Sequence, residues 1–293
     1  TTTYTIEVWG AQGGDAASWT GGKGARMRGD INLTKDEVIK IIVGQKGIDG
    51  AGSGSGHNGG GGGGASAVIK VDNLLIASGG GGGAGTGERG ENGQNGTPGV
   101  ADRDGNHPNG NITSNGARGQ NGNGGTGGNW YAGSGGAGWL TNGGNATNGG
   151  SGSTGGSSLS TTAIGGTGSD YSGGTAGHGG FGGGGGAKIP GGGGGGYSGG
   201  AGASHGTAWN ADGGGGGGSF DGGSNQSNAG DIREGHGQIV ISYSPAPTIT
   251  GVSLASSNST IAVTMSEAVY NTDGGSGALE AADFAFSISG GTA

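Results

Sequence analysis

Residues 191–196 read Gly-Gly-Gly-Gly-Gly-Gly, one of five uninterrupted glycine runs that together decide the fold. The others are residues 59–64, 79–83, 182–186 and 213–218. Glycine fills 90 of the 293 positions, whereas Leu, Ile, Val and Phe together supply only 38. So few large apolar side chains do not build a conventional enzyme core. Much of the chain must therefore be stabilised by something other than side-chain burial.

Two readings of the glycine-rich middle, residues 83–236, are open. A flexible linker is one, because Gly/Ser chains are normally random coils. The other is a bundle of left-handed helices of the polyproline-II type, which have three residues per turn and point every N–H and C=O outward. Glycine lets such helices lie side by side with no Cβ between them, so that backbone hydrogen bonds repay the ordering cost. We expect the second, a polyglycine-II bundle with loops.

The two ends of this region have the pattern of β-strands. Tyr4, Ile6 and Val8 alternate with polar residues or Trp9, the period of two of a half-buried strand. Further strands are expected at residues 25–33, 38–43, 67–71, 74–77 and 238–243. We therefore expect an all-β protein in which residues 1–82 and 237–244 form a β-sandwich base and residues 83–236 are inserted between them.

Several motifs carry a resemblance to a known family. They include Gly10-Ala11-Gln12-Gly13-Gly14, Ile41-Ile42-Val43-Gly44-Gln45-Lys46-Gly47, Leu74-Leu75-Ile76-Ala77-Ser78 and Gly237-Gln238-Ile239-Val240-Ile241-Ser242-Tyr243. In order and spacing they resemble the glycine-rich domain in the ectodomains of anaplastic lymphoma kinase and leukocyte tyrosine kinase, and related bacterial secreted proteins look similar. The resemblance implies a TNF-like β-sandwich with an inserted glycine-helix bundle, and extracellular recognition of a protein ligand. The sequence has no cysteine and no adjoining kinase, so receptor signalling is not expected and only extracellular recognition is carried over.

Composition changes again after Pro245-Ala246-Pro247. Strands are expected at residues 248–254, 259–265 and 284–288. The stretches 266–270 and 279–284 are similar to bacterial Ig-like modules of large surface proteins. Residues 245–293 are thus expected to be a truncated Ig-like β-sandwich, and the sequence a fragment of a longer multi-domain chain.

Charge and motif content argue against several functions. A formal net charge of -8 disfavours nucleic-acid binding, and no apolar run of 18 residues predicts a membrane span. The five histidines lack the spacing of a zinc or general-base site, so we expect neither enzyme activity nor a cofactor. One weak calcium candidate places Asp102, Asp104 and Asn106 at loop positions one, three and five, but the twelfth position is Ser114. An Asn/Asp turn is the alternative there.

Aromatic residues of the middle region are the candidate binding residues: Trp130, Tyr131, Trp139 and Trp209. Tyr and Trp offer large contact areas at little entropy cost, and with Asn, Ser and Gly they make adaptable binding loops. The alternative for any one of them is a structural role, covering an edge of the bundle or packing the bundle against the sandwich. We expect a secreted or cell-surface, non-enzymatic adhesion module that binds a surface glycan or protein. The alternatives are a structural matrix or spacer segment with no specific ligand, and a secreted hydrolase whose catalytic domain lies elsewhere in a longer chain.

Overall fold

The computed structural model describes residues 1–16, 18–52, 58–87, 116–147, 152–205 and 211–243 and, further on, residues 245, 247–257, 259–270, 277–280 and 283. The chain divides into two compact units, Thr1–Tyr243 and Ser244–Ala293. All regular elements among the described residues are β-strands, ten of them, and no α-helix occurs there. The all-β class predicted from the sequence is confirmed, whereas the strand expected at residues 284–288 lies outside the described residues.

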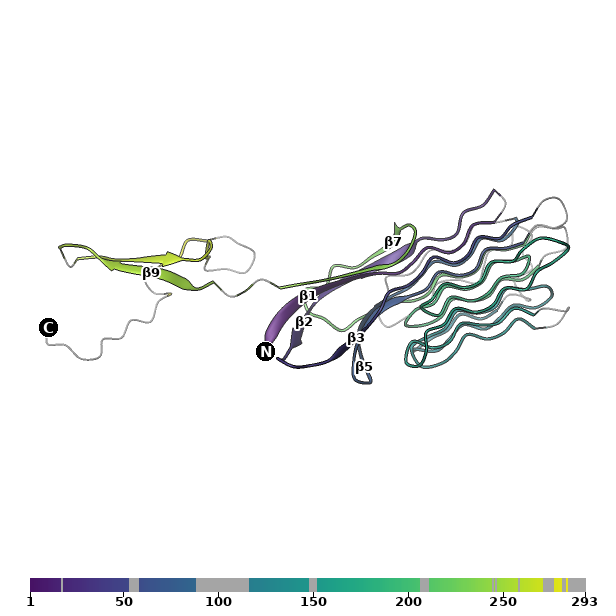
Figure 1. The fold of residues 1–293 in the computed structure, drawn as a ribbon, viewed down its shortest axis with the longest axis horizontal. Helices are drawn as coiled ribbons and strands as arrows, with labels where there is room; N and C mark the ends of the chain where they lie inside the picture. The colour runs from purple at the N-terminus through teal and green to yellow at the C-terminus, as the bar shows by residue number, and fades with distance from the viewer. Residues whose placement is uncertain are drawn as a thin grey trace. The chain divides into compact units, whose positions relative to one another are not determined.

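Two four-stranded sheets form the base of the first unit (Figure 1). The first has the order β7-β2-β1-β8, from β1 (Thr2–Trp9), β2 (Gly24–Leu33), β7 (Ala229–Arg233) and β8 (Gln238–Ser242). The second has the order β3-β4-β5-β6, from β3 (Ile39–Ile42), β4 (Ser66–Lys70), β5 (Asn73–Ser78) and β6 (Phe220–Asp221). Neighbouring strands are antiparallel. The last strand of the unit in sequence, β8, pairs with the first, β1, so that Ile241 lies opposite Ile6.

One apolar cluster joins the two sheets face to face. Ile6 and Val8 of β1 are fully buried, as are Met27 of β2, Val68 of β4 and Ile76 of β5. The intervening residues of β1 and β2 are more exposed, so the period of two in the sequence is also the period of burial. This arrangement has the character of a β-sandwich.

A second apolar cluster lies on the other face of the second sheet. Its strand residues are Ile42, Ala67, Ile69, Leu74 and Ala77. Leu159 and Ala163, from the glycine-rich middle, complete it, and half-buried Trp139 and Tyr197 pack against it. The glycine-rich middle is therefore joined to the second sheet by ordinary apolar contacts, which also explains why β4 is buried on both faces.

The glycine-rich body comprises the described residues of 10–23, 44–65, 79–87, 116–147, 152–205 and 211–219. Its backbone bonds repeat every third residue. In the run 59–64, residues 59 and 62 donate their N–H to the carbonyls of 188 and 185, residues 60 and 63 to those of 84 and 81, and residues 61 and 64 to those of 48 and 45. One segment thus bonds to three neighbours at once, and the segments lie side by side (Figure 1).

These backbones approach too closely to admit a side chain. A Cβ added to Gly62 would lie 2.5 Å from the carbonyl carbon of Gly193 and 3.0 Å from the nitrogen of Gly194. A real Cβ essentially never comes within 3.0 Å of another heavy atom. The glycine runs are therefore required by the spacing of the segments.

Side chains complete the hydrogen bonding where segments border water. The Asn145 Oδ1 accepts the N–H of Gly155 at 3.0 Å, and the Thr154 Oγ1 accepts the N–H of Thr167 at 2.8 Å. An unpaired buried N–H costs about as much as a lost hydrogen bond, so polar residues between the glycine runs have a structural use. Asn and Thr enrichment alone is consequently not a sign of ligand binding.

The second unit contains one antiparallel hairpin among its described residues. It consists of β9 (Ile249–Leu254) and β10 (Ile261–Met265), with Val263 opposite Val252. Its Ig-like character stays a prediction, because two strands do not define an Ig-like sandwich.

Candidate binding surface of the glycine-rich body

Three aromatic side chains and one lysine from separate parts of the glycine-rich body lie together in a group that we call the tyrosine cluster: Tyr131, Tyr171, His205 and Lys188. The rings of Tyr131 and Tyr171 meet edge to face, with centroids 5.2 Å apart and an interplanar angle of 64°. His205 approaches Tyr131 at 6.3 Å in a similar geometry. The Lys188 Nζ lies 5.6 Å from the centroid of the Tyr131 ring. Such edge and cation contacts stabilise the rings in one arrangement.

Hydrogen bonds to backbone and side-chain atoms hold this cluster in place. Asn58, which is buried, donates through Nδ2 to the Tyr171 carbonyl at 3.1 Å and accepts the Tyr171 N–H at 2.9 Å. Lys188 is only 5% exposed and donates to the Ser169 Oγ at 3.3 Å. Burial lowers the pKa of the Lys188 ammonium group. A surface of this kind offers two half-buried phenol rings beside a desolvated cation.

Trp130 precedes the cluster and is 58% exposed. Its φ is +59° and that of Tyr131 is +46°, so two successive bulky residues have a left-handed backbone. This conformation costs roughly 1–2 kcal/mol for a residue with a Cβ, and turns that need it normally use Asn or Gly. The Trp130–Tyr131 turn is thus strained, which is a feature of functional sites more often than of spacers.

The remaining predicted site residues do not join this group. The Trp139 side chain packs against the apolar cluster on the second sheet, and its backbone N–H donates to the Tyr197 carbonyl at 2.8 Å. Trp209 and the calcium candidates Asp102, Asp104 and Asn106 lie outside the described residues. Sequence reasoning did not single out Tyr171, Lys188 or His205 as a group. Their one common signal is position, since each is a large side chain in a glycine- or serine-rich stretch.

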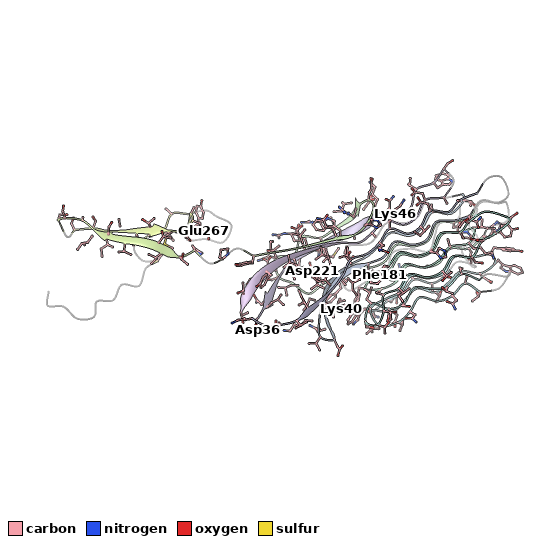
Figure 2. All side chains as sticks on the ribbon, in the orientation of Figure 1. Asp36, Lys40, Lys46, Phe181, Asp221 and Glu267 are labelled. Carbon is pink, nitrogen blue, oxygen red and sulfur yellow. The ribbon has the colours of Figure 1, made fainter. Side chains whose placement is uncertain are left out.

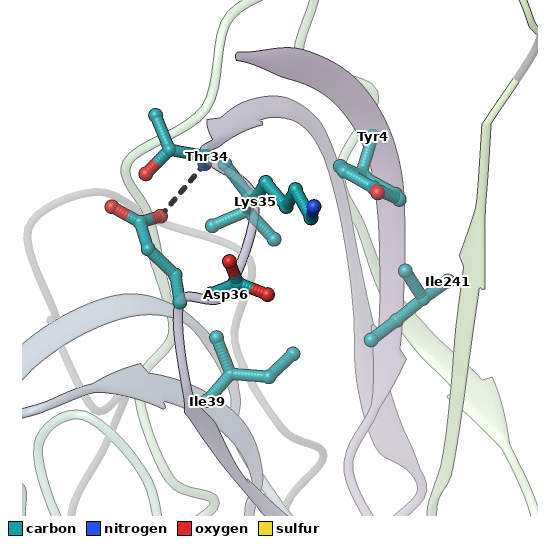
Figure 3. Close-up of a pocket in the computed structure, with 8 residues that line it drawn as sticks. Tyr4, Thr34, Lys35, Asp36, Ile39 and Ile241 are labelled. Carbon is teal, nitrogen blue, oxygen red and sulfur yellow. Dashed lines mark hydrogen bonds between the residues drawn. The ribbon is translucent and has the colours of Figure 1, made fainter.

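A separate concavity of about 350 Å³ opens at an end of the sandwich (Figure 3). Tyr4, Ile39 and Ile241 are among its apolar lining residues, and Glu37 also lines it. Hydrogen bonds from Lys70, at 2.7 Å, and from Thr34 lower the Glu37 pKa to about 2. Glu37 is accordingly a charged, paired group at neutral pH and is unsuited to general-base work there.

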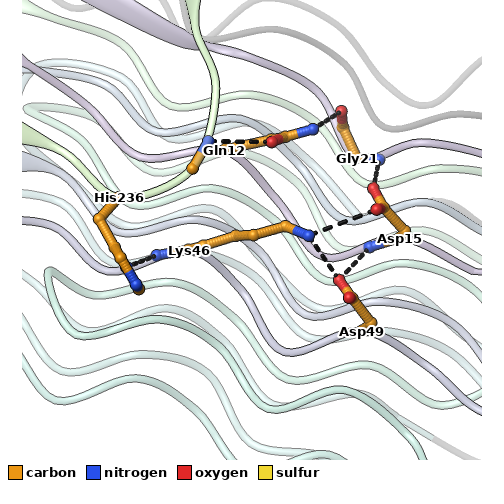
Figure 4. A network of polar contacts seen from close by, with 7 residues as sticks. Gln12, Asp15, Gly21, Lys46, Asp49 and His236 are labelled. Atoms are coloured by element: carbon orange, nitrogen blue, oxygen red, sulfur yellow. Dashed lines mark hydrogen bonds and ion pairs between the residues drawn. The ribbon is translucent and has the colours of Figure 1, made fainter.

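A polar network connects the N-terminal glycine segment to the segment after β3 (Figure 4). The Lys46 Nζ contacts the Asp49 Oδ1 at 2.8 Å and the Asp15 Oδ2 at 3.3 Å. Burial alone would lower the Lys46 pKa, but the bond to Asp49 and the two carboxylate charges raise it on balance. The His236 Nδ1 accepts the Lys46 N–H at 3.0 Å. All of these groups are used to join segments of the fold.

Neither a metal centre nor a membrane helix emerges from the part of the chain that the structure describes. No group of three or more His, Cys, Asp or Glu side chains is arranged there to hold an ion. No helix among those same residues has the length and apolar character needed to span a bilayer.

The comparisons with known proteins leave the resemblance to the receptor glycine-rich domain as a prediction from the quoted motifs. No protein-family model and no curated protein matches this chain.

Proposed function

We propose that this chain is a secreted or cell-surface recognition module, without enzyme activity, that presents the Trp130–Tyr131 turn and the tyrosine cluster to a surface glycan or protein. The observation that carries the proposal is the strained turn with its exposed indole. A segment selected only for stability would have Asn-Gly at this position. A ligand that contacts this pair explains why Trp-Tyr stands at a position where it costs stability.

The glycine-rich body supplies the rigid support in this proposal. We take its segments to be polyglycine-II helices inserted in a TNF-like sandwich; the period-three bonding to three neighbours supports the helices. A body of this kind holds a loop at fixed geometry without needing an apolar core. Binding then costs little ordering entropy, because the aromatic side chains are already placed.

Aromatic residues are suited to this role. Trp and Tyr are enriched among the residues that dominate binding energy, and truncating one commonly costs 2 kcal/mol or more. Trp130 adds exposed apolar area directly before Tyr131 in the chain, and the Tyr131 ring contacts that of Tyr171. A single bulky exposed residue at a left-handed position also occurs at Val71, in the turn between β4 and β5, so the competing proposal of a spacer leaves unexplained only the pairing of two aromatic residues there.

The test replaces Trp130 by Gly in the full chain and compares binding to a glycan and glycoprotein array. We expect the variant to lose binding while its thermal stability stays equal or rises, because glycine adopts a positive φ without strain. Trp19→Ala is the matched control, since Trp19 is another partly exposed indole outside the turn. Equal binding by Trp130→Gly and the wild type would place the site elsewhere. Absence of binding by a well-folded wild type would favour the spacer.

A further inference from the structure

Four consecutive segments of the glycine-rich body form a layer at its surface, which we call the outer layer: residues 141–147, 152–158, 164–169 and 175–180. Neighbours are joined by bonds such as Gly143 N–H to the Gly156 carbonyl at 2.9 Å and Gly179 N–H to the Gly166 carbonyl at 2.8 Å. Each of the first three segments also bonds to residues 135 or 184–186. The side away from these inner segments is open to water.

Five polar side chains of the outer layer share one property: each uses an acceptor atom on a backbone N–H. The acceptors are Thr141 Oγ1 for Gly124, Asn142 Oδ1 for Ser158, Asn145 Oδ1 for Gly155, Thr154 Oγ1 for Thr167 and His178 Nδ1 for Gly168, at 2.8–3.0 Å. Because the partner is always an N–H, the assignment of the amide oxygens and of the imidazole tautomer follows from the bonding.

What each of these side chains has left is a donor. Asn142 and Asn145 retain their Nδ2 hydrogens, Thr141 and Thr154 their hydroxyl hydrogens, and neutral His178 its Nε2 hydrogen. The structure gives none of these five donors an acceptor among the described residues. All but half-buried Thr154 are exposed. The five side chains, which we call the donor row, therefore each keep a hydrogen-bond donor for a ligand, beside the second lone pair of the amide and hydroxyl oxygens.

We propose that the donor row is a second interaction surface and that it binds a neutral polysaccharide. A ligand that uses these donors is rich in acceptor oxygens, which the ring, glycosidic and hydroxyl oxygens of a glycan provide. The formal net charge of -8 disfavours a polyanion, so the acceptors belong to an uncharged chain. This surface shares no residue with the Trp130–Tyr131 turn.

The geometry of the layer favours an extended polymer over a compact ligand. Asn142 and Asn145 lie three residues apart on the first segment, a span of about 9–10 Å for extended backbone. Thr154 lies on the second segment and His178 on the fourth. Exposed apolar side chains accompany them, since Ile164 is 58% exposed and Phe181, just beyond the layer (Figure 2), is 37% exposed. Such side chains suit the C–H faces of sugar rings, whereas the donors suit their oxygens.

The donors are also held in advance of binding. Each side chain is anchored by its bond to a backbone N–H, so little rotamer entropy remains to be lost when a ligand arrives. Individual exposed hydrogen bonds contribute modestly, and specificity must come from several acting together.

A substitution of Asn by Asp separates the structural and binding roles of these amides. The double variant Asn142→Asp, Asn145→Asp keeps both acceptor oxygens for Ser158 and Gly155 but removes both Nδ2 donors. The control Asn32→Asp, Asn73→Asp adds the same charge at exposed positions of the sandwich. Binding is measured on the full chain by affinity electrophoresis in gels containing soluble β-glucan, galactomannan or starch, with melting temperatures recorded for each protein.

We expect the wild type and the control to be retarded by at least one of these polymers. The Asn142→Asp, Asn145→Asp protein should melt normally and bind about tenfold more weakly, as the loss of two hydrogen bonds predicts. Trp130→Gly should be retarded like the wild type, which separates this site from the proposed function. The inference is overturned if no polymer retards the folded wild type, if the double Asp variant binds unchanged, or if Trp130→Gly alone abolishes retardation.

Discussion

Replacing Gly193 by Ala tests the packing of the glycine-rich body most directly. In the structure, a Cβ at this position would lie 2.7 Å from the carbonyl carbon of Gly200, closer still to its oxygen, and 2.8 Å from the Ala201 oxygen. Ordinary contact begins at 3.4 Å, so two backbones must separate by more than half an ångström. No flexible side chain is available to move instead.

The magnitude follows from the hydrogen bonds at this crossing. Gly193 donates to Ser134 at 2.9 Å, Gly200 donates to Gly194 at 2.8 Å, and Gly185 donates to Gly193 at 2.7 Å. A buried bond left unmade costs about 1–3 kcal/mol, so losing two costs about 2–6 kcal/mol. For a unit of this size, that is a decrease in Tm of roughly 5–20 °C. A flexible chain would respond in the opposite direction, because Gly→Ala stabilises an unstrained site by about 0.4–1 kcal/mol through the unfolded state.

Differential scanning calorimetry of the wild type, Gly193→Ala and Gly152→Ala decides between these outcomes. Gly152 is the matched control because its added Cβ would meet only the Ser169 side chain, at 3.1 Å. We expect a large decrease in Tm for Gly193→Ala and a change of a degree or two for Gly152→Ala. An unchanged or higher Tm for Gly193→Ala would refute the close-packed body.

Three further outcomes are expected. Trp139→Ala should lower the free energy of unfolding by about 2–4 kcal/mol in denaturant titrations, because Trp139 packs against the second apolar cluster, whereas exposed Trp130 replaced by Ala should change it by less than about 0.5 kcal/mol. The Glu37 pKa is lowered to about 2, so the pairing of Glu37 stabilises the fold above pH 4.5, and this stabilisation is lost as pH falls toward 2. The melting temperature of Glu37→Gln should therefore be lower than that of the wild type at pH 7 and equal to it at pH 2. Burial raises the Asp221 pKa, which makes its ionisation destabilising as pH rises; Asp221→Asn should gain stability relative to the wild type between pH 4 and pH 7, and parallel melting curves would contradict this.

Six of the eight strands of the two sheets were predictable from the sequence because their signal is local, whereas β6 and β7, in the stretch assigned to the glycine-rich middle, were missed. The alternation of Ile6 and Val8 with polar residues is a property of a few adjacent positions, and so is the glycine content that marks the middle region. The order of the glycine segments could not be predicted, since runs such as 182–186 and 191–196 carry no side chains that distinguish one neighbour from another.

Trp130 and Trp139 show the same limit for the candidate site. Both are tryptophans in glycine- and asparagine-rich surroundings, yet Trp130 is exposed and Trp139 packs against a cluster containing Leu159, Ala163 and strand residues. The partners that separate these two environments come from distant parts of the chain. For the same reason, the gathering of Tyr171, Lys188 and His205 around Tyr131 depends on segment order and has no local signature.

The bonding of the glycine-rich body has a thermal consequence. The heat capacity of unfolding rises with the apolar surface exposed and falls with the polar surface exposed. A body that is joined mainly through peptide groups exposes little apolar surface when it melts, so its heat capacity increment per residue should fall below the usual 12–15 cal/mol/K. The curve of its stability against temperature is then broad and shallow. Cooling therefore destabilises the glycine-rich body less than it destabilises a fold that depends on an apolar core.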